Sequence, residues 1–486
     1  MLQRETIIQL GFLVLGVVLT ALSQVRFGVG MLGWIAPVPF LLYLLRTKGV
    51  WSRVLLCIAL CIAWTLATAK FITAPFPPTL IALNGMTFGV LSAIAFLSWQ
   101  RLQQNLPLWM SHLTFPAIML SLEWVQSEFT PLASNGSAAY TQLENLPFLQ
   151  WASLFGIAGI GFLMYWFAAV VAGSLHHRRF YVRQSATVTA LIVGAHIFGS
   201  FRIGAPLDSN MVKVATIGTD SAWFGEAIPS QKERARINDT LFNRTEAAAT
   251  AGAKLIVWNE VSNIVFPTEE KTMVERAGAI AKRFNTHVVM SALVALETNP
   301  LRVENKLIRV SPNGNVKDTY LKQKRVPGEP SVPGQTPSQV SDSDIGRLGG
   351  AICYDFDFPQ VARQLAIQHA DIVYLPSSDT VGVDPFHSQI AAIRAIEGGY
   401  SIVRSTRMGL SAAIDYHGRI RGWQSANEEN DRILLATIPS ESICTLYALT
   451  GDIVSYLATL FVLFCIGYRF YRRQLPPPDS SKRVPE

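Results

Sequence analysis

The sequence predicts a polytopic α-helical membrane protein of about eight spans, with one α/β domain inserted between the seventh and the eighth. Two observations lead to this fold class. Half of the 486 residues are hydrophobic and only 15% are charged, which is too apolar for an ordinary soluble protein. The charges are sparse as far as Ile203 and frequent from Lys213 to Arg432. The chain is therefore expected to join a membrane-embedded part to a water-facing part.

Eight apolar runs predict the membrane part, because a spanning helix needs roughly 20 mostly apolar residues. The runs are Thr6–Ser23, Gly28–Leu45, Val54–Ile72, Thr79–Trp99, Leu106–Val125, Leu146–Ala172, Ser185–Phe201 and Ile453–Tyr468. Arg4 precedes the first run, and no small-residue cleavage site follows it, so this run is expected to be a retained anchor and not a signal peptide.

Basic residues in the loops predict the orientation. They gather after the second, fourth, sixth and eighth runs, at Arg46, Lys48, Arg53, Arg101, Arg178, Arg179, Arg183, Arg469, Arg472 and Arg473. The opposite loops hold only Arg26 and Lys70, and residues 126–145 hold no basic residue. Because basic loops stay in the cytoplasm, both termini are expected there and the inserted domain outside. The same rule explains the net charge of +7 without a nucleic-acid partner.

The expected organisation has four segments. These are a seven-helix membrane domain at residues 1–205, an α/β domain at 211–440, a last membrane helix at 450–474 and a tail at 475–486 that is too polar and proline-rich to pack.

Short β-rich runs alternate with helical patterns in the second segment. Strands are expected at Val212–Ile217, Lys254–Trp258, His287–Val294, Asn305–Val310, Val316–Leu321, Gly349–Cys353, Ile372–Leu375, Tyr400–Arg404, Ser411–Asp415 and Arg432–Thr437. Helices are expected at Pro229–Gly252, Lys271–Phe284 and His387–Gly398. This alternation predicts a layered α/β domain whose sheet faces are largely covered.

Three polar residues directly follow buried strands: Glu260, Lys322 and Cys353. Catalytic groups of open α/β sheets gather at such strand ends. A cysteine nucleophile must ionise, and a nearby ammonium and carboxylate assist it. The Tyr354 N–H and the Lys322 ammonium could together stabilise an oxyanion. From the residues alone, a structural cysteine and surface salt bridges are equally open. The five cysteines are odd in number and lack metal-like spacing, so neither a disulfide framework nor a zinc site is expected. No cofactor is predicted.

Three stretches, KLIVWNE, YLKQKRVPGE and GGAICYDFDFP, resemble in this order the Glu, Lys and Cys signatures of the nitrilase superfamily of carbon–nitrogen hydrolases. The later stretch HSQIAAIRAIEGGYSIVRSTRMGL resembles the helix, strand and turn that follow in that superfamily. The resemblance implies an αββα sandwich with a Glu–Lys–Cys triad. Seven spans before such a domain and one after it resemble the layout of the bacterial apolipoprotein N-acyltransferase family, so the resemblance covers nearly the whole chain.

The resemblance implies roles by position. Cys353 would be the nucleophile, Glu260 the general base and Lys322 the oxyanion-stabilising cation, with Lys324 as a rival to Lys322. Substrate-positioning roles would fall to Glu329, Tyr354, Asp355 and Trp223. For Trp223, a packed surface aromatic is an equally open interpretation. His387 and His417 are interpreted as helix-start and turn residues in preference to ligands. Arg394 and Arg407 could anchor a phosphate or pair with carboxylates such as Glu397, and the pairing is favoured. For Glu123, a functional role and a place at the membrane interface both stay open.

Some segments depart from the family. The family has a longer, partly apolar arm where this chain has only the polar run Pro330–Gly346. The segment Ser377–Gly382 lacks the family's Ala-Trp-Phe, and residues 126–145 lack its Gly-Phe-Pro-Trp. These differences affect the choice of substrate and not the triad.

The resemblance implies an enzyme of the bacterial inner membrane with its catalytic domain on the periplasmic side. It would transfer an acyl chain from a phospholipid donor to the N-terminal amine of a diacylglyceryl-modified lipoprotein, through a thioester on Cys353. A membrane-tethered amidase of nitrilase type is the first alternative, supported by the polar run Pro330–Gly346. A non-catalytic lipid-binding protein that uses the same fold is the second.

Overall fold

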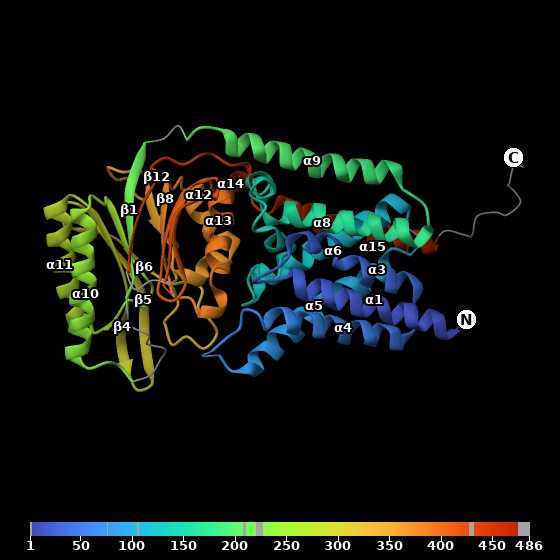
Figure 1. The fold of residues 1–486 in the computed structure, drawn as a ribbon, viewed down its shortest axis with the longest axis horizontal. Coiled ribbons are helices and arrows are strands. Elements are labelled where there is room, and N and C mark those ends of the chain that lie inside the picture. The colour runs from blue at the N-terminus through green and yellow to red at the C-terminus, as the bar shows by residue number, and fades with distance from the viewer. Residues whose placement is uncertain are drawn as a thin grey trace, which may run out of the picture.

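A bundle of helices lies end to end with a layered α/β domain in the computed structural model (Figure 1). The structure describes residues 2–74, 76–104, 106–207, 210–219, 227–426 and 432–474. The tail at 475–486, for which disorder was predicted, and Trp223 lie outside the described residues. The fold class predicted from the sequence, a polytopic membrane protein with an inserted nitrilase-type domain, is confirmed.

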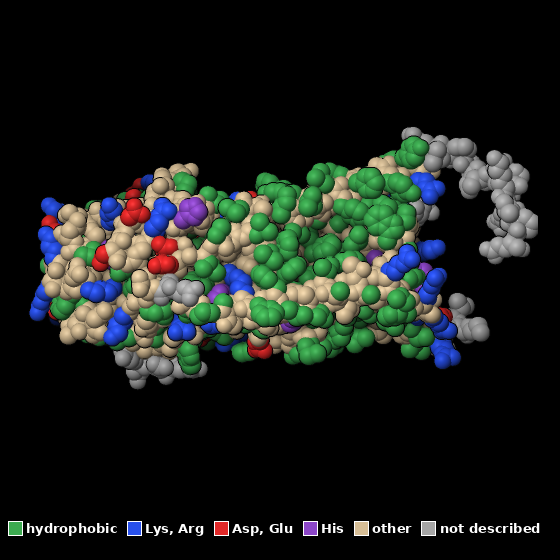
Figure 2. All heavy atoms as spheres, turned by 90° about the horizontal axis from the view of Figure 1, so that it is seen from above, with side chains coloured by type: hydrophobic (Ala, Val, Ile, Leu, Met, Phe, Trp, Pro, Cys, Tyr) green, Lys and Arg blue, Asp and Glu red, His purple; other side chains and the backbone are tan. Residues whose placement is uncertain are grey.

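Apolar helices build the membrane half. They are α1 (Leu2–Ser23), α2 (Gly30–Ile35), α3 (Pro37–Arg46), α4 (Val50–Thr68), α5 (Pro78–Leu102), α6 (Leu108–Phe129), α8 (Ala152–His177), α9 (Val182–Gly204) and α15 (Ile453–Gln474). Among the described residues, six helices are long and apolar enough to cross a membrane, namely α1, α4, α5, α8, α9 and α15. The count of eight spans stays a prediction. Hydrophobic side chains cover this half, and Lys and Arg gather at its end far from the α/β domain (Figure 2).

Two predicted runs are interrupted. The run Gly28–Leu45 is divided into α2 and α3, because Pro37 and Pro39 lack the N–H groups that would continue the hydrogen-bond ladder. The run Leu146–Ala172 begins with the single turn α7 (Leu146–Leu149), and α8 contains Gly156 at φ +63°. A Cβ at Gly156 would meet the ring of Tyr447 at 2.5 Å, so close packing requires glycine there.

Two sheets form the centre of the α/β domain. The first has the order β12-β1-β2-β4-β5-β6, with β3 beside β4, and the second has the order β11-β10-β9-β8-β7. The strands of the first are β1 (Met211–Ile217), β2 (Leu255–Trp258), β3 (Ile264–Val265), β4 (His287–Thr298), β5 (Leu301–Val310), β6 (Val316–Leu321) and β12 (Ile433–Pro439). The strands of the second are β7 (Leu348–Gly350), β8 (Ile372–Ser377), β9 (Ser401–Thr406), β10 (Leu410–Ile414) and β11 (Ile420–Ser425).

Helices cover both outer faces and give four layers. The helices α10 (Gln231–Thr250) and α11 (Pro267–Phe284) pack on the first sheet, and α12 (Pro359–Ile367) and α13 (Phe386–Gly398) pack on the second. The α12–α13 layer faces the membrane helices, whereas α10 and α11 lie at the far end (Figure 1). The sequence patterns missed α12 and β11, and they extended β7 to Cys353, which instead begins the 3₁₀ turn η2 (Cys353–Asp357).

Helix α13 belongs to two hydrophobic cores. Its alanines Ala391, Ala392 and Ala395 belong to the hydrophobic core of the α/β domain, on the side of the helix that packs on the second sheet. Its larger side chains Phe386, Ile390, Ile393 and Ile396 pack in the core of the membrane helices. Because this helix is apolar on two sides, it fixes the catalytic domain directly on the bundle.

A buried ion pair lies within this junction. Arg394 and Glu397, one helical turn apart on α13, are paired and fully buried, as the sequence interpretation expected. Arg394 also donates hydrogen bonds to the hydroxyls of Ser134 and Tyr140 from the membrane half. Glu397 accepts the backbone N–H of Ile157, beside the Gly156 break, at 2.9 Å. The ion pair on α13 thus forms hydrogen bonds with buried polar groups of the membrane half and joins the two halves of the molecule.

Glu123 of α6 lies close to this junction. Its carboxylate accepts hydrogen bonds from the Tyr165 hydroxyl at 2.5 Å and from the Ser137 hydroxyl at 3.0 Å. These hydrogen bonds tie α6 to α8 and to the loop before η1 (Ala138–Gln142). Glu123 thus cross-links these segments. This contact does not decide between a functional role and a place at the membrane interface.

Replacing Arg394 should destabilise the junction strongly. Arg394→Met would leave the Glu397 carboxylate buried without its cation, a change that costs about 3–5 kcal/mol. We expect a clear fall in Tm, measured by differential scanning fluorimetry in detergent. Arg302→Met, which breaks the exposed ion pair with Glu297, is the matched control and should leave Tm nearly unchanged. Equal Tm values for the two variants would contradict a structural role for the Arg394 pair.

Candidate active site

Glu260 follows β2 at the edge where the two sheets meet. Its backbone N–H donates to Ser377 O, at the end of β8, at 3.2 Å, so the first sheet is tied to the second at this point. The Glu260 side chain is only 3% exposed. A carboxylate buried to this degree requires a charged or hydrogen-bonding partner.

Lys322 supplies that partner. It follows β6, is 2% exposed, and its Nζ lies 2.8 Å from Glu260 Oε1 and 2.8 Å from Glu329 Oε2. Asn305 of β5 joins the same two carboxylates, with its Nδ2 at 2.8 Å from Glu260 Oε1 and 2.9 Å from Glu329 Oε1. The rival Lys324 lies elsewhere, with its Nζ over the ring of Phe358.

The loop from Val326 to Ser331 holds Glu329 in place. Glu329 Oε2 accepts the Val326 N–H at 3.1 Å, and its Oε1 accepts the Ser331 hydroxyl at 2.8 Å. Burial acts to raise the pKa of Glu329, but the Lys322 charge and these hydrogen bonds outweigh it and lower that pKa. Glu329 is therefore a second fixed negative charge beside Lys322.

Cys353 is the first residue of η2 and adopts φ +46°, a left-handed conformation that is rare for a side chain with a Cβ. Its Sγ is partly buried and lies 4.0 Å from Ser378 O. Burial and the nearby Glu260 carboxylate raise the pKa of the Cys353 thiol well above its usual value, although Lys322 acts in the opposite direction. The resting sulfur is therefore a thiol, and a base must take its proton before it can attack.

The charge on Lys322 is stable in the same surroundings. Burial alone would lower the pKa of Lys322, but Glu260, Cys353 and Glu329 reverse that effect and raise it. The ammonium therefore stays protonated at neutral pH. A fixed buried cation next to a neutral thiol and a carboxylate is an arrangement suited to acyl transfer through a covalent thioester.

The turn η2 (Cys353–Asp357) begins with the predicted nucleophile and is called the nucleophile turn. Asp355 connects this turn to the end of β6. One carboxylate oxygen accepts the Tyr320 hydroxyl at 2.8 Å and the Ile352 N–H at 3.0 Å, and the other accepts the Lys324 N–H at 2.8 Å. Asp355 is fully buried, and burial raises the pKa of this carboxyl to about 6. These contacts fix the turn on which Cys353 lies.

Tyr354 contacts the membrane half. Its hydroxyl donates to Pro131 O, in the loop after α6, and its ring packs edge-on against Phe358. Burial raises the pKa of Tyr354, so the hydroxyl remains a donor. The residue after Cys353 therefore joins the nucleophile turn to the membrane domain.

A second buried charge cluster, formed by Asp379, His387 and Arg404, lies close to Cys353. The sequence patterns did not predict it. Arg404 of β9 donates to both oxygens of Asp379 at 2.8 and 2.9 Å. His387, at the start of α13, lies 3.1 Å from Asp379 and 3.6 Å from Asp357. Burial would lower the pKa of His387, but the two aspartates outweigh it and raise that pKa, so they favour the protonated imidazole. His417, by contrast, lies in the turn after β10, as expected.

Arg407 lies close to the same site. Its backbone N–H donates to Ser377 O at 3.2 Å, the oxygen that also accepts the Glu260 N–H. Burial lowers the pKa of Arg407 to about 10, while Glu260 and Cys353 act to raise it. The Arg407 guanidinium therefore interacts electrostatically with Glu260 and Cys353, and the interaction with Glu260 is of the kind expected with a carboxylate.

The polar run Pro330–Gly346 is fixed to the first sheet. Val332 N donates to Val303 O at 2.8 Å, and Gly334 N donates to Lys322 O at 2.8 Å. Ser338 and Ser331 are buried.

The described residues contain no group of three His, Cys, Asp or Glu side chains that could hold a metal ion.

Comparisons with known proteins give consistent matches along the chain. Residues 214–446 match the family model of carbon-nitrogen hydrolases, and residues 16–170 match that of the apolipoprotein N-acyltransferase N-terminal domain. The apolipoprotein N-acyltransferase of Bradyrhizobium diazoefficiens is 26% identical over 74% of each chain. That of Gloeobacter violaceus is 25% identical over 91% of this chain and 90% of its own. An amidase from Nesterenkonia sp. is similar in structure, with a TM-score of 0.39 at 17% identity, over 54% of this chain and 96% of its own.

The raised pKa of the Cys353 thiol predicts how it reacts with a small alkylating reagent. Because only the thiolate reacts, the rate of iodoacetamide addition at Cys353 should still be rising above pH 9. Glu260→Gln removes one charge that opposes ionisation and should shift the curve to lower pH. Intact-mass kinetics on a variant whose other four cysteines are replaced by alanine would measure both curves. A plateau below pH 8 in the wild-type site would contradict the neutral resting thiol.

Proposed function

Because the chain belongs to the apolipoprotein N-acyltransferase family, we propose that it moves an acyl chain from a phospholipid to the amine of a lipid-modified N-terminal cysteine. The observation that carries the proposal is the buried Lys322 ammonium, 2.8 Å from both Glu260 and Glu329, beside the Cys353 thiol. The chemistry is acyl transfer in two halves.

In the first half, Glu260 takes the Cys353 proton and the sulfur attacks the ester carbonyl of the phospholipid. The Lys322 ammonium and the Tyr354 backbone N–H stabilise the oxyanion that forms. The carbon–oxygen bond then breaks, and Glu260 returns the proton to the departing lysophospholipid oxygen. A thioester on Cys353 remains.

In the second half, the neutral amine of the acceptor attacks the thioester carbonyl. Glu260 takes a proton from the amine, the carbon–sulfur bond breaks and the sulfur leaves. The proton returns to Cys353, so the site is restored and no cofactor is consumed. The high pKa of the thiol supports this return, because the thiol is the favoured resting form.

The other predicted site residues have positioning roles in this proposal. Glu329 pairs directly with Lys322, and Asn305 donates a hydrogen bond to Glu329. Asp355 fixes the nucleophile turn through Tyr320 and the Ile352 N–H. Trp223, for which a substrate-loop role was predicted, lies outside the described residues.

We further propose that the protein lies in a bacterial inner membrane with both termini in the cytoplasm and the catalytic domain on the periplasmic side. Two observations support this orientation. Lys and Arg gather at the end of the bundle that lies farthest from the catalytic domain (Figure 2). The α12–α13 layer faces the bundle (Figure 1), and Tyr354 of the nucleophile turn donates a hydrogen bond to Pro131 O of the membrane half.

A membrane-tethered amidase is the second candidate, and one observation favours it. The run Pro330–Gly346 is polar and is held against β5 and Lys322 instead of extending as an apolar arm. Such a site would give its acyl group to water. The two candidates share the thioester and differ only in the acceptor.

The thioester itself can be tested with labelled phospholipid. Purified wild-type protein should accumulate an acyl thioester, and Cys353→Ser should show none. Glu260→Gln should slow its formation by about 10²–10⁴-fold, because the general base is lost. Cys444→Ser, which removes an exposed thiol, is the matched control and should behave as wild type.

The acceptor decides between the two candidates. Addition of a diacylglyceryl peptide with a free N-terminal amine should discharge the thioester to a triacylated peptide, detected by mass spectrometry. Release of free fatty acid alone in the presence of this peptide would favour the amidase. Failure to form any thioester would reject both.

A further inference from the structure

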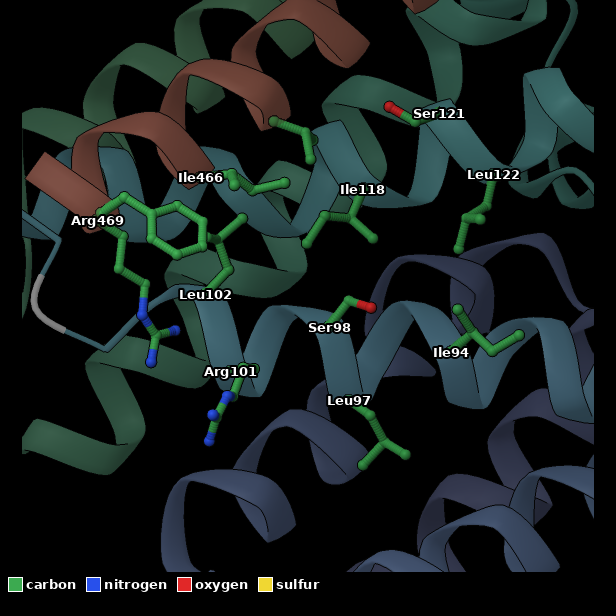
Figure 3. Close-up of a pocket in the computed structure, with 12 residues that line it drawn as sticks. Ile94, Leu97, Ser98, Arg101, Leu102, Ile118, Ser121, Leu122, Ile466 and Arg469 are labelled. Carbon is green, nitrogen blue, oxygen red and sulfur yellow. The ribbon is translucent and has the colours of Figure 1, made fainter.

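A groove with a volume of about 640 Å³ lies in the membrane half between α5, α6 and α15 (Figure 3). This volume falls within the roughly 300–1,000 Å³ range of small-molecule sites. Its walls are mainly apolar, with Ile94 and Leu97 from α5, Ile118 and Leu122 from α6, and Ile466 and Phe470 from α15. The side chains of Ile94, Ile466 and Phe470 are 46%, 39% and 62% exposed, so the groove opens on the lipid-facing surface.

Two guanidinium groups lie at one end of this groove. Arg101 is near the C-terminus of α5 and Arg469 is in the last turns of α15, and both side chains line the groove at the same end (Figure 3). The opposite end is formed by Ile94 and Leu122. The groove is therefore cationic at one end and hydrocarbon-like along the rest of its length.

The groove is separate from the candidate active site. The loop before α5 reaches the catalytic domain, where the Phe71 ring faces Phe386 of α13 at 6.4 Å. Arg101 lies on the last turn of α5, which at 1.5 Å per residue is roughly 35 Å along the helix from Pro78 at its start. The cationic end thus belongs to the side of the bundle far from Cys353, where Lys and Arg gather (Figure 2).

We propose that this groove binds an anionic glycerophospholipid from the membrane leaflet on that side, with its phosphate group on Arg101 and Arg469 and one acyl chain along the apolar wall. Charge complementarity carries the assignment, because basic pockets between membrane helices on this side are suited to acidic headgroups. The site goes beyond the proposed function. This lipid is a bound structural ligand of α5, α6 and α15 and does not react at Cys353.

The experiment uses delipidated full-length protein in detergent, titrated with dioleoyl phosphatidylglycerol and observed by native mass spectrometry. The double variant Arg101→Gln/Arg469→Gln should lose at least about tenfold in apparent affinity, because both phosphate contacts are removed. The double variant Arg179→Gln/Arg183→Gln is the matched control. It removes two exposed arginines from the same end of the bundle, outside the groove, and should bind as wild type does.

A second variant tests the apolar wall independently. Ser98→Phe fills the groove while both arginines remain, and it should also lose binding. Equal losses in the two arginine double variants would overturn the proposal, because general surface charge would then explain binding. Wild-type affinity for Ser98→Phe, or equal affinity for dioleoyl phosphatidylcholine, would overturn it as well. Unchanged Tm values would show that each variant is folded.

Discussion

The ammonium of Lys322, buried between two carboxylates, is the interaction on which the catalytic end of the molecule depends. It joins the end of β6 to the end of β2 through Glu260, and to the following loop through Glu329. Removal of Lys322 would leave both carboxylates without their cation, which is costly in a protein interior. Burial and the Glu260 charge raise the pKa of the Cys353 thiol, although Lys322 acts to lower it. The thiol form is therefore favoured at rest, and in the proposed mechanism the sulfur becomes nucleophilic when its proton moves to Glu260.

Polar contacts continue from this site to the membrane helices. Asp357, at the end of the nucleophile turn, lies 3.6 Å from His387, and its side chain accepts the Asn135 amide at 3.1 Å. Its backbone oxygen accepts the Ser134 N–H at 3.2 Å, and the Ser134 hydroxyl in turn contacts Arg394 of α13. The orientation of Cys353 relative to the membrane helices is therefore fixed by buried hydrogen bonds.

Much of this arrangement could be predicted from sequence, because it depends on local patterns. The apolar runs predicted the membrane helices, and the position of Glu260, Lys322 and Cys353 after buried strands predicted that they would lie together. Other features depend on contacts between distant segments. Asn305 looks like an ordinary polar residue inside a strand until β5 and β6 pair. The Asp379, His387 and Arg404 cluster joins three elements, and the Gly156 break is required by the Tyr447 ring, which is almost 300 residues away in the sequence.

The double packing of α13 has a consequence for how the protein is assembled in a cell. A catalytic domain separated from its helices would present Phe386, Ile390, Ile393 and Ile396 to water as one continuous apolar stripe. During synthesis this stripe becomes shielded only when the preceding seven helical runs are already inserted and packed together. Because α15 packs on α6 and α8 but follows the catalytic domain in sequence, the bundle can be completed only after the catalytic domain has been synthesised.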